Sequence, residues 1–427
     1  MSLKKEIVKK SVFFTSWQIL SKVIGVIYFS LVAKILKPFE YGILGICMSI
    51  FEMFSTLYVC TNNAIIKYVA EKREKSVMER GLKINALIGI ILFAILFIFA
   101  EPIGSLFNLE ISALIRLVAV FLLLSSIKET FSNIMLGTTE IKYYIINEAF
   151  FAVTKLVLVS VILFMTYSVF GVFLGLILTT LLTILLSLWI VNNIRFAKGT
   201  IAYQTLINYS TKFFVLTIMY QLHPQIFIFL LAKLSTVTHV GFYKFLYGLT
   251  SLLIITIPQS FSFMIFPYLS RFSREQNKRA MEKIYNMGLK FALLSSLLIS
   301  LVFFLIVPFI IHWIFPAYSE ATPYILPFLF FGIVTSIAFI TGTLIKATNN
   351  LDVQLKTTPL GIVLSATLAF VLIPSYGIGG ASFAFGLGAL FNLILMTHLI
   401  LKRLDIHLDL IPTKEDFYLV KSVFKKK

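Results

Sequence analysis

Apolar runs of helix length recur along the whole chain, and they constrain its fold more than any other feature. The stretch "SWQILSKVIGVIYFSLVAKIL", residues 16–36, is typical of them. As a helix, about 20 such residues cross the roughly 30 Å hydrocarbon core of a bilayer. Only 13% of the residues are charged and the mean hydropathy is +0.95, whereas soluble domains are about 25% charged. We therefore expect an all-α polytopic membrane protein.

Twelve runs can be separated in the 427 residues. They lie near residues 11–36, 41–66, 84–107, 113–136, 145–167, 170–194, 205–232, 240–268, 288–313, 323–346, 357–374 and 379–401. Proline interrupts the apolar pattern at Pro102, Pro308, Pro316 and Pro323. We expect helices to end or bend there, because proline removes a backbone hydrogen bond.

Lys and Arg are distributed unevenly among the segments that connect these runs. The N-terminal tail, the even-numbered loops and the C-terminal segment hold 28 of them, and the odd-numbered loops hold four. Cytoplasmic loops carry the excess of positive charge in membrane proteins. We therefore expect a multi-pass protein of the cell (plasma or inner) membrane with both termini in the cytoplasm. Basic loops at a membrane surface favour anionic membrane lipids as partners rather than nucleic acid.

The second half of the chain repeats the first. The segment "LVAKILKPFEYG" is echoed by "LLAKLSTVTHVG", so that Lys34 and Lys233, and likewise Gly42 and Gly241, are 199 residues apart. Each half then has a long run, a charged loop that closes on "GLK" and an apolar run that reaches a proline. An internal repeat of this length predicts two structurally similar lobes.

Six runs in each half give both halves the same orientation in the membrane. The sequence therefore predicts a parallel pseudo-two-fold repeat of two six-helix lobes, an architecture used for alternating access. We expect an N-terminal lobe over residues 1–200, a C-terminal lobe over residues 201–402 and a basic cytoplasmic tail over residues 403–427, with a linker near residues 195–204. Superposing the two lobes should need a rotation of nearly 180° about the membrane normal.

Two charged loops, residues 67–83 and 271–290, mix both signs of charge over helical lengths. We expect each of them to form an amphipathic helix on the cytoplasmic face.

The sequence contains few motifs typical of catalysis, nucleotide binding or metal binding. We therefore expect neither enzymatic activity nor a cofactor nor a metal site. No Asp-x-Asp pair and no glycine-rich phosphate loop with its lysine occur in the sequence, which disfavours metal-bound nucleotide chemistry and direct use of ATP. The histidines lack the spacing of metal ligands. They are His223, His239, His312, His398 and His407.

The start of the chain, "SWQILSKVIGVIYFSLVAKILKPFEYGILGI", has a polar helix entry with Gln18 and a Tyr-Gly pair that opens the second run. These features, the charged loop that follows, the six-plus-six repeat and "GIGGASFAFGLGALFN" resemble the MATE-like superfamily of multidrug, oligosaccharidyl-lipid and polysaccharide exporters. The resemblance is closest to its Wzx-type (O-antigen) flippases. It implies that the protein moves an oligosaccharide on a polyprenyl pyrophosphate from the cytoplasmic to the outer leaflet. It also implies that spans 1, 2, 7 and 8 line a central cavity.

Ionisable residues inside spans are functional candidates, since a lysine at a helix centre costs about 3 kcal/mol on insertion scales. Several polar and charged residues fall in the four spans that the resemblance assigns to the cavity. The substrate-binding candidates are Lys22, Gln18, Glu52, Lys212, Lys244 and Gln221. We expect Lys22 to attract the anionic headgroup. The competing interpretation is that Lys22 pairs with Glu52 to hold two helices together, while Lys212 and Lys244 extend to the interfaces.

The first half contains further intramembrane charges. Lys128 and Glu129 are adjacent and point about 100° apart on a helix, so neither should be the other's sole partner. Glu148 and Lys155 share a face and are consistent with packing inside the lobe. In related drug and cation antiporters, carboxylates of the first lobe couple to protons or sodium. The corresponding coupling-ion candidates are Glu52, Glu129, Glu148 and Asn147.

Three functions remain open from the sequence. They are a flippase for lipid-linked oligosaccharide, an ion-coupled multidrug or cation antiporter of the same superfamily, and a non-transporting membrane scaffold for glycan-assembly enzymes. A net positive cavity disfavours cationic drugs. Glycan polymerases or transferases are possible partners for a flippase or a scaffold. We expect the tail "IPTKEDFYLVKSVFKKK" to anchor at the membrane surface.

Overall fold

The computed structural model describes residues 3–138 and 140–409, except for the side chains of residues 3–16, 18, 19, 212 and 213. Nearly all of this part of the chain is helical, and within it the only β-type pairing is an isolated bridge between Glu74 and Ala197. The chain divides into two compact units between Lys244 and Phe245. The first unit therefore includes one helix and part of another beyond residue 200.

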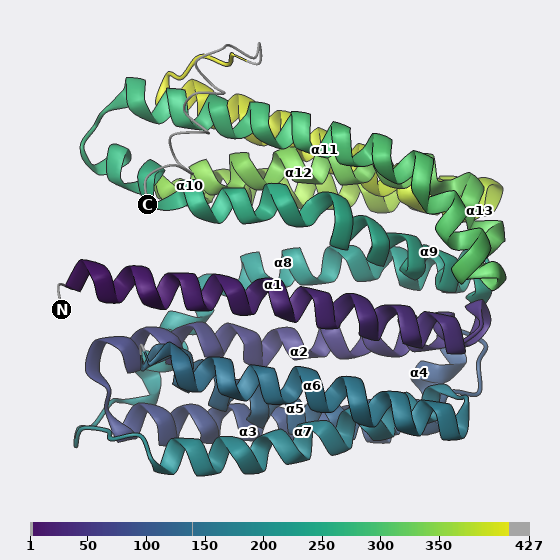
Figure 1. The fold of residues 1–427 in the computed structure, drawn as a ribbon, viewed down its shortest axis with the longest axis horizontal. Coiled ribbons are helices and arrows are strands. Elements are labelled where there is room, and N and C mark those ends of the chain that lie inside the picture. The colour runs from purple at the N-terminus through teal and green to yellow at the C-terminus, as the bar shows by residue number, and fades with distance from the viewer. Residues whose placement is uncertain (1–2, 139, 410–427) are drawn as a thin grey trace. The chain divides into compact units, whose positions relative to one another are not determined.

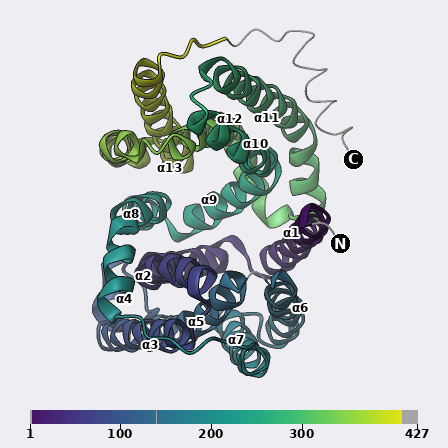
Figure 2. The ribbon, with the colours of Figure 1, turned by 90° about the vertical axis from the view of Figure 1, so that its left-hand side faces the viewer.

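The first unit is a bundle built around two central helices. Its elements are α1 (Leu3–Ile35), α2 (Pro38–Lys72), α3 (Lys75–Ile98), α4 (Ala100–Leu106), α5 (Ser112–Gly137), α6 (Ile141–Thr166), α7 (Val169–Asn192), α8 (Tyr203–Leu234) and the start of α9 (Val237–Thr250). Helix α2 packs against α3, α5 and α8, α5 packs against α7, and α6 packs against α7 and α1 (Figures 1 and 2). Polar side chains on α2, α5 and α6 therefore face other helices.

The second unit continues from α9 and is arranged around α12. Its elements are η1 (Ser251–Ile255), α10 (Thr256–Arg274), α11 (Lys278–Ile314), η2 (Pro316–Tyr324), α12 (Ile325–Ala347) and α13 (Leu351–Leu404). Helix α12 packs against α10, α11 and α13. The element η1 is a π-helical segment inside an otherwise α-helical span, a local widening that is rare in proteins and frequent at functional sites.

The predicted spans correspond to these helices. Among the described residues, nine helices are long and apolar enough to cross a membrane. One of these, α13, contains two predicted spans, and α1 and α5 supply the remaining two of the twelve. The all-α polytopic fold class is therefore confirmed.

The division of α13 occurs at Gly377. This residue has φ 50° and ψ −122°, a conformation that strongly favours glycine because it has no Cβ. A Cβ at Gly380 would overlap the carbonyl oxygen of Leu372, so the chain folds back closely after the break. The predicted boundary between residues 374 and 379 lies at this kink.

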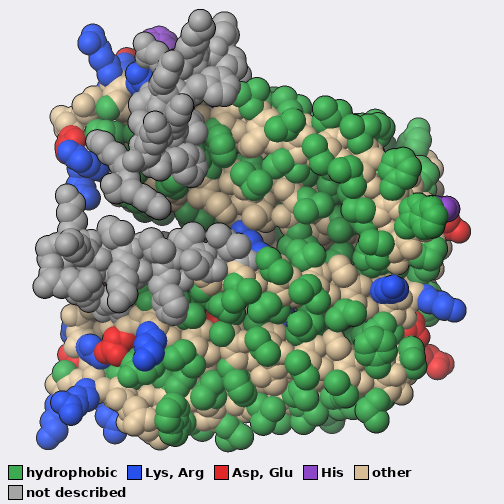
Figure 3. Space-filling view, viewed as in Figure 1, with side chains coloured by type: hydrophobic (Ala, Val, Ile, Leu, Met, Phe, Trp, Pro, Cys, Tyr) green, Lys and Arg blue, Asp and Glu red, His purple; other side chains and the backbone are tan. Residues whose placement is uncertain are grey.

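Large apolar side chains cover the outer face of α6. The exposed ones recur every three or four residues, as expected for one side of a helix. They are Ile146, Phe150, Val153, Val157, Val161 and Phe164. Figure 3 shows hydrophobic side chains over most of the face drawn, with Lys and Arg gathered toward the ends. Such a surface suits lipid.

The two predicted surface helices are not present, so that prediction is wrong. In residues 67–83, α2 continues to its end and α3 begins after a short break at Arg73, which has φ 49°. In residues 271–290, α10 and α11 meet in the same way at Gln276, with φ 53°. Both charged segments therefore consist of the end of one long span and the start of the next. The left-handed residue between them ends the first helix.

The two cysteines, Cys47 and Cys60, are both free and buried on α2; their spacing along one helix puts them about 20 Å apart, too far for a disulfide.

A close helix contact gives the sequence repeat a spatial counterpart. A Cβ at Gly42 would overlap the carbonyl oxygen of Val237, and a Cβ at Gly241 would overlap the carbonyl oxygen of Pro38. Pro38 and Val237 are also 199 residues apart. Contacts made reciprocally by equivalent residues are the signature of a two-fold axis. Glycine is required at both positions because the starts of α2 and α9 approach at backbone distance.

Candidate functional site

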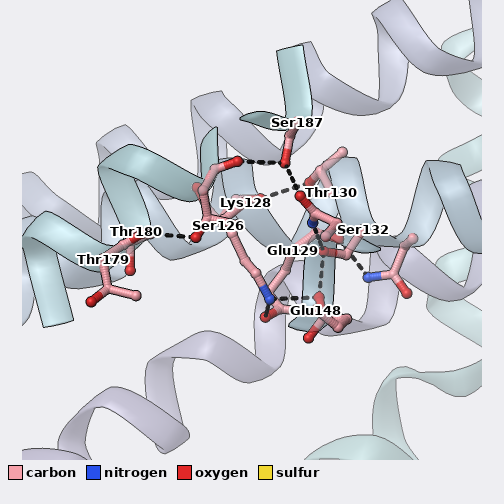
Figure 4. A network of polar contacts seen from close by, with 12 residues as sticks. Ser126, Lys128, Glu129, Thr130, Ser132, Glu148, Thr179, Thr180 and Ser187 are labelled. Atoms are coloured by element: carbon pink, nitrogen blue, oxygen red, sulfur yellow. Dashed lines mark hydrogen bonds and ion pairs between the residues drawn. The ribbon is translucent and has the colours of Figure 1, made fainter. Parts of the chain in front are cut away.

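Lys128 lies at the centre of a buried polar network in the first unit (Figure 4). Its side chain on α5 is 2% exposed. The ammonium Nζ is 2.7 Å from Glu148 Oε1 on α6 and 3.1 Å from Glu129 Oε1. The centre of the Phe151 ring lies 4.2 Å from the same Nζ, a cation–π distance. The expectation that Lys128 and Glu129 are not each other's sole partners is confirmed.

A series of hydrogen bonds extends this network to α7. The Ser187 hydroxyl donates to Asn147 Oδ1 at 2.8 Å, and Asn147 Nδ2 donates to Ser132 Oγ at 3.0 Å. The Ser132 hydroxyl then donates to Glu148 Oε1 at 2.7 Å. Asn147 and Ser132 are buried. Three of the four coupling-ion candidates, Glu129, Glu148 and Asn147, therefore belong to one network.

Lys155, which shares a face of α6 with Glu148, contacts aromatic rings. Its Nζ lies 4.6 Å from the centre of the Tyr28 ring on α1 and 5.6 Å from that of Phe151. These contacts join α1 to α6.

A second polar cluster lies along the contact between α2 and α8. Gln225 Nε2 donates to Glu52 Oε2 at 2.5 Å, and the Thr56 hydroxyl donates to Gln221 Oε1 at 2.6 Å. Glu52 and Thr56 are four residues apart, as are Gln221 and Gln225, so successive turns of the two helices pair with each other. We call these four residues the α2–α8 seam.

The seam has unused hydrogen-bonding capacity. Gln225 is 4% exposed, and its Oε1 is buried with no hydrogen-bond partner among the described residues. A buried carbonyl oxygen without a donor is costly, about 1–3 kcal/mol. Glu52 and Gln221 are only partly buried. These two side chains can therefore accept further hydrogen bonds from a ligand.

Lys244 of α9 lies over the same face of α2. A Cβ at Gly45 would come within 2.9 Å of Lys244 Cγ, so glycine makes room for the aliphatic stem of the lysine. Gly45 and Glu52 are seven residues apart and share a helix face. Lys244 therefore lies against the face of α2 that also carries Glu52.

Lys22 is half-buried on α1. With the described side chains it makes no ion pair or hydrogen bond, and Glu52 instead accepts from Gln225. The proposed Lys22–Glu52 pair is therefore not formed among these residues. Two other candidates, Gln18 and Lys212, lie on α1 and α8 with side chains outside the described part of the chain.

Sequence reasoning missed Gln225 and Thr56. Gln225 could have been found, since it lies one helical turn after Gln221 in "QLHPQ". Thr56 gives no comparable signal, because threonines in spans commonly bond to their own helix backbone. Among the described residues no group of three or more His, Cys, Asp or Glu side chains could hold a metal ion.

A comparison with protein families identifies the family of this chain. Residues 7–273 match the family described as polysaccharide biosynthesis protein. A search of curated proteins by sequence found no match.

Solved structures share the fold over most of the chain. An inward-facing multidrug resistance MATE family transporter of the MOP superfamily aligns with TM-score 0.73 at 14% identity, covering 90% of this chain and 94% of that chain. The lipid II flippase MurJ in an inward closed conformation aligns with TM-score 0.69 at 12% identity, covering 91% and 87%. An outward-facing MATE family transporter gives TM-score 0.64 at 16% identity, covering 90% and 94%. Identities this low establish the fold, and the sequence match establishes the family: the chain belongs to the polysaccharide biosynthesis protein family.

Proposed function

We propose that the protein is an alternating-access flippase that moves a polyprenyl-pyrophosphate-linked oligosaccharide from the cytoplasmic to the outer leaflet. The observation that carries the proposal is the α2–α8 seam, where Glu52 and Gln221 are partly buried beside a Gln225 Oε1 that has no donor among the described residues. Membership of a polysaccharide biosynthesis family and a fold shared with a lipid II flippase support it.

The residues of the first unit suit the two parts of such a substrate. Sugar hydroxyls donate and accept hydrogen bonds, and in this proposal they bond to Glu52 and Gln221 at the seam. The ammonium groups of Lys22 and Lys244 attract the pyrophosphate, since charge-assisted hydrogen bonds to phosphate are stronger than neutral ones. Gln18 and Lys212 are proposed to extend these polar faces.

The proposed orientation in the membrane follows from the distribution of basic residues. Lys and Arg gather in the N-terminal tail and even-numbered loops, so in this proposal both termini are cytoplasmic. The sequence repeat supports lobes over residues 1–200 and 201–402, with the tail 403–427 at the membrane surface. Recruitment of a glycan polymerase or transferase is a further prediction from the pathway that such a substrate requires.

The antiporter alternative is less well supported by the geometry. It needs carboxylates of the first lobe to bind a proton, a sodium ion or a cationic drug. Glu129 and Glu148 instead bind the ammonium of Lys128. Glu52 remains available to this alternative, and its Gln225 partner is neutral.

The experiment is a translocation assay with the purified full chain in liposomes. A fluorescent polyprenyl-pyrophosphate oligosaccharide is placed in both leaflets, and an impermeant quencher reports how fast the protected leaflet exchanges. The proposal predicts rapid exchange with protein and none in protein-free liposomes. Export of a cationic dye without exchange of the lipid would support the antiporter, and activity with neither substrate would support the scaffold.

A further inference from the structure

The ammonium of Lys128 has its hydrogen-bonding capacity filled without water. A lysine ammonium has three N–H donors. Two carboxylate oxygens lie at 2.7 and 3.1 Å and the Phe151 ring centre lies at 4.2 Å, so two ionic partners and one aromatic face surround the cation. Its side chain is almost completely buried. The ammonium is therefore enclosed by groups of the protein itself.

Several hydrogen-bond donors converge on Glu148. The Lys128 ammonium and the Ser132 hydroxyl both donate to Glu148 Oε1, and Ser132 is itself held by Asn147 Nδ2. Every one of these hydrogen bonds is directed toward the carboxylate.

The three charged side chains of the network differ in exposure: Lys128 is buried, Glu148 is partly buried and Glu129 is more accessible. Lys128 and Glu148 compensate each other inside the bundle, whereas the Glu129 side chain is 42% exposed. If the ammonium were absent, the carboxylate oxygens of Glu129 and Glu148 would face a vacant position, with the Ser132 hydroxyl bonded to the second of them. Oxygen ligands of this kind suit hard cations, and sodium is one of these.

We propose that Lys128 is a tethered cation that permanently occupies a cation-binding position formed by Glu129 and Glu148, so that this network takes up no dissociable sodium ion. One consequence, which rests on the proposed flippase function, is that translocation does not require a sodium gradient acting through this network. Removing the ammonium should convert the same position into a sodium site.

The first test measures thermal unfolding of the purified full chain and does not depend on any substrate. Lys128→Met is melted in sodium chloride and in choline chloride of equal ionic strength. Its melting temperature should lie below that of the native protein in choline and rise by several degrees with increasing sodium, because a ligand that binds only the folded state stabilises it. The native protein should melt at the same temperature in both salts.

The double variant Lys128→Met/Glu148→Gln is the matched control. It removes the buried charge pair while keeping hydrogen-bonding groups on α6, so it should fold and show no response to sodium. A sodium-dependent rise in the melting temperature of the native protein that Glu148→Gln abolishes would overturn the proposal. A folded Lys128→Met variant that is indifferent to sodium would also overturn it. If Lys128→Met does not fold in either salt, the native protein and Glu148→Gln decide the question.

The second test uses the liposome assay with equal sodium on both sides, with an inward sodium gradient and with choline alone. The native exchange rate should be the same in all three, and that of Lys128→Met should fall in choline. The contrary result is a native exchange rate that depends on sodium. If the double variant keeps that dependence, the coupling site lies outside the Lys128 network, and the consequence stated for translocation is refuted. Absence of exchange in every condition would count against the flippase function and leave the melting result intact.

Discussion

Lys128 and Lys22 are both lysines within membrane spans of the first unit, and their surroundings differ sharply. Lys128 on α5 is buried against two carboxylates and an aromatic ring. Lys22 on α1 is half-buried and pairs with none of the described side chains. The cost of placing an ammonium in a membrane span is offset in the first case by fixed protein charges. In the second case it needs water or an anionic ligand.

This difference separates charges that maintain the fold from charges that are available to substrate. The Lys128 network is internally paired, because most of its donors and acceptors bond to one another across α5, α6 and α7. The α2–α8 seam has a buried Gln225 acceptor without a partner among the described residues, and partly buried carboxylate and amide groups in Glu52 and Gln221. We infer that mutations in the network reduce stability and mutations around the seam reduce transport.

The largest expected effect is at Lys22. Lys22→Ala should abolish exchange of the lipid-linked oligosaccharide and leave the melting temperature near that of the native protein, because no described side chain loses a partner. Lys22→Arg should retain part of the activity, since the charge is kept. Lys244→Ala should be milder than Lys22→Ala. Normal exchange by a folded Lys22→Ala protein would remove Lys22 from the substrate path.

Glu148→Gln should cause the next largest effect, on stability. It removes one of the two carboxylates that compensate a buried ammonium, and breaking such a pair costs about 3 kcal/mol. The melting temperature of purified protein measures the loss. Glu129→Gln is the matched control, because its more exposed carboxylate should matter less. Equal losses in the two variants would show that burial of Glu148 does not determine the effect.

The close contact of Gly42 on α2 with Gly241 on α9 allows a purely steric effect on stability to be measured. Gly42→Ala and Gly241→Ala should each destabilise the protein by about 1–3 kcal/mol, as overpacking does, and by similar amounts because the contact is reciprocal. Gly25→Ala is the control: nothing lies within 4 Å of its added Cβ, and alanine favours a helix by about 1 kcal/mol. Strongly unequal effects of the first two would argue against a two-fold relation there.

The smallest effect should come from an exposed ion pair, the contrast to the buried Lys128 pair. A hydrogen bond from Lys278 lowers the pKa of Asp405 below its ordinary value of 3.8. The stabilisation is therefore present above about pH 3.8 and is lost as the pH falls through the lowered pKa. Asp405→Asn should slightly lower the melting temperature at pH 7 and leave it unchanged in strong acid. An effect as large as that of Glu148→Gln would contradict the weight given to burial.

Hydropathy and the repeat predicted the helices well, because apolar length and loop charge are local properties of the chain. Even the break in α13 lay near Gly377, within "PSYGIGG". The side-chain partners of the charged residues were harder to predict. Glu148 lies 20 residues from Lys128, and Glu52 pairs with Gln225 rather than with Lys22.

Those pairings depend on how helices are rotated and shifted against each other, which periodicity within one helix does not determine. The surface helices failed for a related reason. A charged stretch of helical length looks the same in sequence whether it is one separate helix or the ends of two long ones, and the left-handed residue at Arg73 decides between them.

The most direct test of the division between fold and transport compares two carboxylate-to-amide changes of equal size. Glu52→Gln and Glu148→Gln are reconstituted in liposomes, and the exchange rate of lipid-linked oligosaccharide is divided by the amount of folded protein. Glu52→Gln should lose at least about tenfold, equivalent to about 1.4 kcal/mol, with an unchanged melting temperature. Glu148→Gln should keep its rate per folded molecule while melting earlier. The opposite pattern, with Glu52→Gln transporting normally and Glu148→Gln inactive although folded, would contradict the account.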